Sequence, residues 1–269
     1  MLYIIKGEFL KLKRLHILFI GIIGMTFPSI LSVFTQAVAT PEAITGDFNF
    51  STHFNSTIWN STTIFMPVIF TLMGGYLINR EYTDNTLKNI LPVPLSFQRL
   101  LLGKLLAMGS LSVMFGFYNY AVTLLVGLLS GISGLNTEVL ITGLLQILGT
   151  AAFTYIAILP VIAFTSRKPG SFMGGVVVSF LFGYIAMFIK NATIRSVYPI
   201  LSGLTVTGFD TGSFMNTSGT GNLPLSILSL VFMLLLTLLI ITQAVPPQTT
   251  YKSKKRKTAS YFLRPGQKG

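Results

Sequence analysis

Long stretches of this 269-residue sequence contain no Asp, Glu, Lys or Arg, and the clearest are 15–41, 105–137, 139–166 and 211–251. A charged side chain at the centre of a membrane-spanning helix costs about 2.5–3.5 kcal/mol, so uncharged runs longer than about 20 residues are typical of spans. Only 10% of all residues are charged, against roughly 25% in soluble domains. The sequence therefore predicts an integral membrane protein and argues against an ordinary soluble enzyme.

We predict an all-α integral membrane protein with six transmembrane helices. The expected spans are 15–38, 61–79, 105–131, 139–165, 171–189 and 224–243. The chain then divides into a cytoplasmic amphipathic segment (1–14), the six-span domain (15–243) and a basic cytoplasmic tail (244–269).

Basic residues divide unequally between the two sides of this topology. Of the 19 Lys and Arg residues, all except Lys190 and Arg195 fall on the side that holds both termini. Cytoplasmic segments carry the excess of basic residues, so we expect both ends in the cytoplasm of a bacterial cell and a multi-pass protein in its cell membrane. Segments 39–60 and 190–223 are then expected outside, the second with a short interfacial helix.

The N-terminal segment has an amphipathic pattern. Its apolar residues, spaced three or four apart, are Leu2, Ile5, Phe9 and Leu12, with charged residues between them. This spacing indicates a helix lying in the cytoplasmic interface, and a basic leader that only sets orientation explains it equally well. In the tail, 252–257 holds five basic residues close to the last span. We interpret the tail as a contact with anionic membrane lipids and expect no nucleic-acid partner.

No catalytic or metal-binding motif is present. The sequence has no cysteine, and His16 and His53 are predicted on opposite membrane faces, so we expect no metal site. It has no Gly-x-x-x-x-Gly-Lys-Ser/Thr loop to hold a phosphate. We therefore expect a protein that is not an enzyme and has no cofactor of its own.

Polar groups inside the predicted spans are few and uncharged. Ion-driven carriers usually keep ionisable groups at membrane depth, and the predicted spans contain none, although a sodium site made of backbone carbonyls would escape this test. The main polar residues of the third and fourth spans are Asn119, Thr123, Gln146, Thr150 and Thr154. They are candidates either for a substrate path or for hydrogen bonds between helices.

The segment between the second and third spans carries the most specific pattern. A short helix is predicted from about Thr83 to Leu91, with Thr83 or Asp84 as the N-cap and with Pro92 and Pro94 after its end. Leu87, Ile90 and Leu91 share one face of it, and Glu81 and Asp84 lie at its start. A compact unit of this kind suits docking onto a partner protein.

This segment resembles the membrane subunits of type-2 ABC transporters. The residues that match the family pattern are Glu81, Thr86, Leu87, Lys88, Ile90, Leu91, Pro94, Ser96, Arg99 and Lys104. Asn85 replaces the usual Gly, and two residues separate Ser96 from Arg99. The basic leader, the six spans and the long segment before the last span also fit the family.

The resemblance implies a permease subunit of an ATP-driven exporter. Its partners would be a cytoplasmic ABC ATPase that binds the ATP and a second permease copy or paralogue, with segment 83–91 as the coupling helix. Size and loop pattern are similar to the lantibiotic-immunity and bacitracin-export group, which implies a peptide antibiotic or another amphipathic or hydrophobic cargo, in self-immunity or efflux. An ion-coupled secondary transporter and a non-transporting membrane scaffold are the alternatives.

The fifth predicted span has a continuous face of small residues. These residues, four apart, are Ser171, Gly175, Ser179 and Gly183. A face of this kind allows another helix to approach closely. The neighbour is expected to be a helix of the same chain or a helix of a second permease.

Overall fold

The computed structural model describes residues 7, 17–38, 48–83, 97–165, 167–168, 170–215 and 221–244, and within them the chain is helical apart from turns and one isolated bridge between Asn49 and Ser133. The elements in chain order are α2 (Ile17–Val38), α3 (Phe50–Asn60), the π-helical turn η2 (Ser61–Phe65), α4 (Met66–Thr83), α6 (Phe97–Leu129), α7 (Thr137–Thr165), α8 (Phe172–Ala186), α9 (Ala192–Val197), α10 (Pro199–Val206), α11 (Thr211–Phe214) and α12 (Leu223–Thr242). The predicted amphipathic segment 1–14 and the basic tail fall outside the described residues, except for Gly7 and Ala244.

Several helices are long and apolar enough to cross a bilayer. Among the described residues there are five, namely Ile17–Val38, Phe50–Glu81, Phe97–Leu129, Thr137–Thr165 and Leu223–Thr242. The protein is therefore an all-helical, multi-pass membrane protein. Helix α8 has 15 residues, or about 22 Å, which is less than the roughly 30 Å of a hydrocarbon core. The sixth span stays a prediction.

The second spanning helix begins well before the predicted boundary at 61. Asn49 caps α3, because its Oδ1 accepts a hydrogen bond from the Thr52 N–H at 3.0 Å and the Asn49 N–H donates in return to the Thr52 hydroxyl oxygen at 2.9 Å. Phe50 and Phe54 then bury one face of the helix. The Asn/Ser/Thr-rich composition had predicted a polar loop here. Burial of the aromatic face outweighs that composition.

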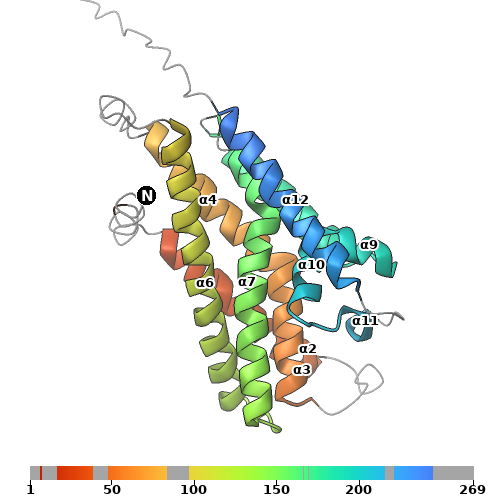
Figure 1. Ribbon diagram of the computed structural model, residues 1–269. Helices are drawn as coiled ribbons and strands as arrows, with labels where there is room; N and C mark the ends of the chain where they lie inside the picture. The colour runs from red at the N-terminus through yellow and green to blue at the C-terminus, as the bar shows by residue number, and fades with distance from the viewer. Residues whose placement is uncertain are drawn as a thin grey trace, which may run out of the picture.

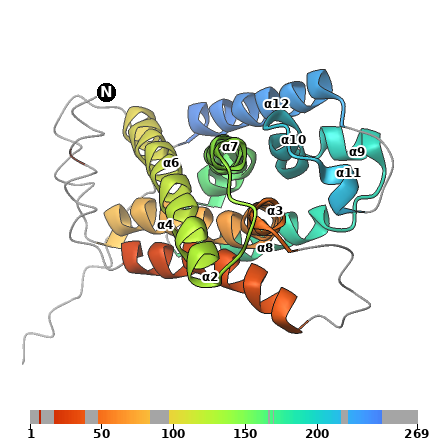
Figure 2. The same ribbon diagram turned by 90° about the horizontal axis from the view of Figure 1, so that it is seen from below.

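Helix α7 lies at the centre of the bundle, with α6, α12, α10, α3 and α4 around it (Figure 2). Helices α6 and α7 form a long antiparallel pair joined by a tight turn at 130–136 (Figure 1). Gly131 and Gly134 adopt positive φ angles of 67° and 86° in this turn, a backbone region that favours glycine. The Phe50 N–H donates to the Ser133 carbonyl at 2.9 Å, so the turn is fixed to the start of α3.

The described residues form two apolar cores. One lies among α2, α4, α6 and α7, and its fully buried members include Met25, Phe70, Met73 and Ile158. The other lies among α3, α7 and α10, and includes Phe50, Ile58, Ile147, Ile200 and Leu201. By contrast, α2, α8 and α12 each present a row of exposed large apolar side chains. Such surfaces suit contact with lipid.

The segment after α8 differs from the single interfacial helix that we predicted. It forms two short helices, α9 and α10, and only part of the apolar set is buried: Ile200 and Leu201 are inside, whereas Ile194 and Val197 are exposed. Arg195 was expected on an outer loop but is fully buried, with its guanidinium 3.4 Å from the Thr211 hydroxyl.

Candidate functional site at the basic end of the bundle

Four parts of the chain meet at the upper end of the bundle in Figure 1: the end of α4, the start of α6, the α7–α8 turn and the end of α12. Hydrogen bonds between these parts hold them together. They are Gly170 N–H to Asn79 Oδ1 (2.7 Å), Gln98 Nε2 to the Thr242 carbonyl (2.7 Å) and the Arg167 guanidinium to the Ile240 carbonyl. The four parts therefore form one connected platform.

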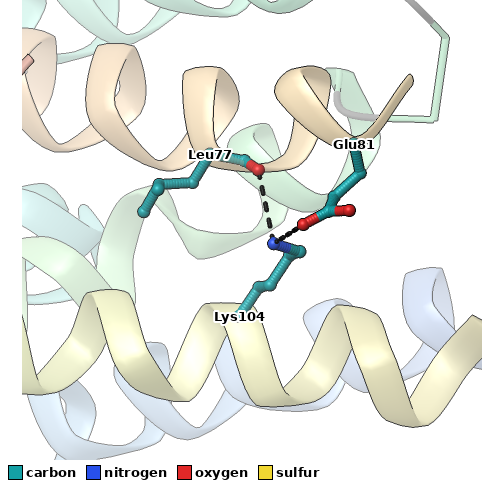
Figure 3. Close-up of polar contacts among 3 residues, drawn as sticks. All are labelled: Leu77, Glu81 and Lys104. Atoms are coloured by element: carbon teal, nitrogen blue, oxygen red, sulfur yellow. Dashed lines mark hydrogen bonds and ion pairs between the residues drawn. The ribbon is translucent and has the colours of Figure 1, made fainter. Parts of the chain in front are cut away.

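A buried ion pair joins α4 to α6 within this platform (Figure 3). Lys104 Nζ lies 2.9 Å from Glu81 Oε1 and 3.5 Å from the Leu77 carbonyl oxygen. The two side chains are only 3% and 8% exposed, Lys104 and Glu81 respectively. Removing one member of a buried pair leaves an uncompensated charge, at a cost of about 3–5 kcal/mol. The pair thus fixes the two helices at the base of segment 84–96.

This geometry corrects one expectation about Glu81. The sequence placed Glu81 at the start of a unit suited to docking onto a partner protein, but its carboxylate points inward to Lys104 (Figure 3). The two residues are 23 positions apart, so spacing alone did not reveal the pair. A partner protein would therefore meet other residues of this end.

The remaining residues of the predicted coupling segment fall almost entirely outside the described residues. These are Asp84, Thr86, Leu87, Lys88, Ile90, Leu91 and Pro94. Arg99 is described, and it is an exposed residue in the first turn of α6.

Basic side chains gather at this end of the bundle. Within the described ranges they are Arg80, Arg99, Lys104, Arg167 and Lys168. Lys190 and Arg195 follow the far end of α8 instead. The three-dimensional arrangement thus keeps the two groups of basic residues apart.

A buried polar network crosses the half of the bundle that lies away from the platform. The imidazole of His53, in α3, lies between α2 and α6, with Nδ1 2.9 Å from the Ser32 hydroxyl and Nε2 3.1 Å from the Thr123 carbonyl oxygen. The Thr123 hydroxyl bonds to that of Ser29 at 2.8 Å. His53 is thus a buried residue of a helix and does not lie in the loop that we expected over 39–60. It is also an ionisable side chain in a helix that is long and apolar enough to span a bilayer.

Asn119 continues this network. Its Nδ2 donates to the Ser61 hydroxyl at 2.9 Å, and its Oδ1 is 3.2 Å from the Thr123 hydroxyl. The side chain is fully buried, so it joins helices and does not line an open path in this conformation. The signal for the network was the Phe50, Phe54, Ile58 spacing, which marks a helical face around His53.

The other candidate path residues are not brought together. Thr150 is fully buried and its hydroxyl donates to the Ile147 carbonyl in its own helix. Thr154 is also fully buried, and its hydroxyl has no hydrogen-bond partner. Gln146 borders a small cavity of about 140 Å³ beside Glu138, far from the platform.

The small face of α8 packs against elements of the same chain. Its four contacts are Ser171 Oγ to the Thr165 carbonyl, Gly175 against the Thr165 side chain, Ser179 Oγ with the Thr71 hydroxyl (2.6 Å), and Gly183 against the Thr63 carbonyl. A Cβ at position 183 would overlap that carbonyl oxygen. The π-helical turn that contains Thr63 is therefore in direct contact with α8, and the exposed face of α8 is its opposite side.

Comparison with known proteins relates the chain to one transporter family. The family model described as ABC-2 family transporter protein matches residues 4–186. The bacitracin transport permease protein BCRB of Bacillus licheniformis is 26% identical over 131 residues, which cover 49% of this chain and 62% of that relative. The match thus spans less than two thirds of the relative's length. No solved structure matches the chain.

Proposed function

This chain belongs to the ABC-2 transporter family, with a bacitracin transport permease among its relatives, and from that premise we propose that it is the membrane subunit of an ATP-driven exporter. A separate cytoplasmic ABC ATPase would bind and hydrolyse the ATP. A second copy of the chain, or a paralogue, would complete the transport path.

The observation that carries this proposal is the buried Glu81–Lys104 ion pair. It joins α4 to α6 at the two ends of segment 84–96, which holds the predicted coupling helix. A force applied to this segment by an ATPase would move both helices together, because the pair resists their separation. Helix α4 packs on α8 and helix α6 packs on α7, so the movement would spread through the bundle.

We also propose that the platform faces the cytoplasm. The basic residues of the described chain are concentrated there, as are the segments expected to be cytoplasmic, and positive charge favours the inner side of the membrane. Helix α8, together with the residues that follow Ala186, would provide the sixth crossing of the membrane. Both termini would then be cytoplasmic in a bacterial cell membrane.

For the cargo, we propose a peptide antibiotic or a similar amphipathic compound. The name of the bacitracin permease relative supports this class, and so does the resemblance of the sequence to lantibiotic-immunity exporters. Expression of the chain with its ATPase should raise the concentration of bacitracin or of a lantibiotic needed to stop growth of a sensitive host. Unchanged sensitivity to both compounds would contradict this cargo class while leaving the exporter assignment open.

The decisive experiment is reconstitution with and without a candidate ABC ATPase from the same organism. The two subunits should purify together, and export by vesicles should require both the ATPase and ATP. Leu87→Asp, in the predicted coupling helix, should weaken this association, whereas Glu138→Gln, exposed at the opposite end, should not. Cargo movement by the purified chain without any ATPase would overturn the proposal.

One observation favours a second candidate function. His53 is an ionisable side chain buried inside a spanning helix, and such residues often serve ion-coupled carriers. In that case transport by the purified chain would follow a proton gradient and would need no ATPase. The same reconstitution therefore separates the two candidates.

A further inference from the structure

A groove runs along the bundle between α6 and α12, with α7 as its floor. Its volume is about 400 Å³, which lies within the range of small-molecule sites. Leu102 and Ile241 line the end nearer the platform, and Ser112 and Leu234 line the inner end. The groove is therefore elongated along the helices.

The walls of the groove are mainly apolar, and the hydroxyl groups among them already donate their hydrogen bonds within the protein. Its three polar side chains each donate to a backbone carbonyl of the helices that form the groove: Ser112 to Gly109 (2.8 Å), Tyr155 to Leu105 (2.6 Å) and Thr237 to Met233 (2.8 Å). A polar ligand would lose hydrogen bonds to water and would find few partners here, because only the oxygens of these three hydroxyl groups could still accept. The groove suits a hydrocarbon chain.

The groove is accessible from the membrane. Leu106 and Leu238, on its two rims, are 49% and 48% exposed. Both belong to helices long and apolar enough to span a bilayer. A chain could therefore enter sideways from the lipid phase.

The end of the groove at the platform carries positive charge. Arg99 stands one helical turn before Leu102 and two turns before Leu106, on the same stripe of α6. Arg167, in the turn between α7 and α8, contacts the end of α12, because its guanidinium donates a hydrogen bond to the Ile240 carbonyl. Its Nε is buried and has no hydrogen-bond partner. Neither arginine lines the groove itself, but both belong to the platform next to this end, where their positive charge would attract an anionic headgroup.

We propose that this groove binds one acyl chain of an anionic phospholipid, with the phosphate of the headgroup against Arg99 and Arg167. Hydrocarbon gains little by moving from the bilayer into an apolar groove, because lipid tails are as apolar as leucine. The headgroup charge would therefore set the selectivity over neutral lipid. This site goes beyond the proposed export function and requires neither ATP nor an ATPase.

Photo-crosslinking tests the site directly. The full chain is placed in vesicles of phosphatidylethanolamine and phosphatidylglycerol that contain a trace of either lipid with a diazirine in the middle of one acyl chain. Phosphatidylglycerol should label α6 and α12 around Leu106 and Leu238 well above the exposed face of α8. Arg99→Gln should reduce its advantage over phosphatidylethanolamine about fivefold, the loss expected for one basic residue at an anionic surface.

Two matched pairs of variants control the experiment. Ala152→Leu fills the floor of the groove and should abolish labelling at the groove, whereas Ala121→Leu, exposed elsewhere on α6, should leave it intact. Lys190→Gln removes a charge far from the groove and should leave the lipid preference unchanged. Labelling as strong on α8 as at the groove, or equal labelling by the two lipids, would overturn the proposal. So would crosslinks from Leu106 to a second copy of this chain.

Discussion

The Glu81–Lys104 ion pair allows a test in which two substitutions together should lower the stability of the protein less than either one alone. Glu81→Gln leaves a buried ammonium without its carboxylate, and Lys104→Met leaves a buried carboxylate without its ammonium. The double variant Glu81→Gln/Lys104→Met combines the two changes, removes both charges and keeps similar side-chain volume. We expect each single variant to be strongly destabilised and the double variant to be close to the original protein.

The magnitude follows from the geometry. At 2.9 Å the Coulomb attraction is about 6 kcal/mol for an effective dielectric constant of 20. Desolvation of the two charges offsets much of it, and loss of one partner of a buried pair typically costs about 3–5 kcal/mol. Each kilocalorie shifts the melting temperature of a protein of comparable size by roughly 2–4 °C. The single variants should therefore melt roughly 6–20 °C lower.

Thermal melting of the purified, detergent-solubilised chain, followed by size-exclusion chromatography, measures this directly. Glu138→Gln is the matched control, because it makes the same chemical change at an exposed position. A shift below about 2 °C for Glu81→Gln would contradict a buried pair. A double variant destabilised by the sum of the two single effects would show that the charges do not interact.

Three further predictions concern topology, packing and the polar network. In this cysteine-free chain, Leu135→Cys should react with a membrane-impermeant thiol reagent in intact cells and Lys168→Cys should not; the reverse result would invert the orientation. Gly183→Ala should lower the unfolding free energy by roughly 1–3 kcal/mol, because the new methyl overlaps a backbone carbonyl. Gly174→Ala, in open space on the same helix, should be neutral in the same melt, and equal tolerance would contradict the packing. His53→Leu should cost about 1 kcal/mol in stability through lost hydrogen bonds between helices and should leave ATP-driven export in vesicles intact. Loss of export at normal stability would instead support ion coupling.

The spanning helices could be predicted from the sequence where the absence of charged residues is enough to identify a span. The cost of a buried charge belongs to each segment separately, so the uncharged runs located α2, α7 and α12 without any knowledge of their neighbours. Helix α3 was missed for the opposite reason. Its Asn, Ser and Thr residues are compatible with a loop or with a helix, and only the surrounding aromatic and apolar partners favour the helix.

In the candidate site, too, the sequence identified some residues but not the contacts that depend on neighbouring helices. The sequence singled out both Glu81 and Lys104, and it placed them at either end of one connecting segment. The two side chains face each other only because of the rotation of α4 relative to α6. This rotation is fixed by packing along the whole length of both helices. His53 likewise became a network residue only when α2 and α6 supplied a hydroxyl and a carbonyl on its two sides.

The length of α6 has a mechanical consequence. Its 33 residues extend about 50 Å, whereas a hydrocarbon core is about 30 Å thick. Lys104 lies seven residues from the start of the helix and 25 from its end, at distances of about 10 Å and 38 Å. A rigid α6 that pivots at Lys104 is a lever with arms of these lengths. A sideways displacement of 1 Å at Phe97 would thus become a displacement of about 3.6 Å at Leu129, at the opposite end of the helix.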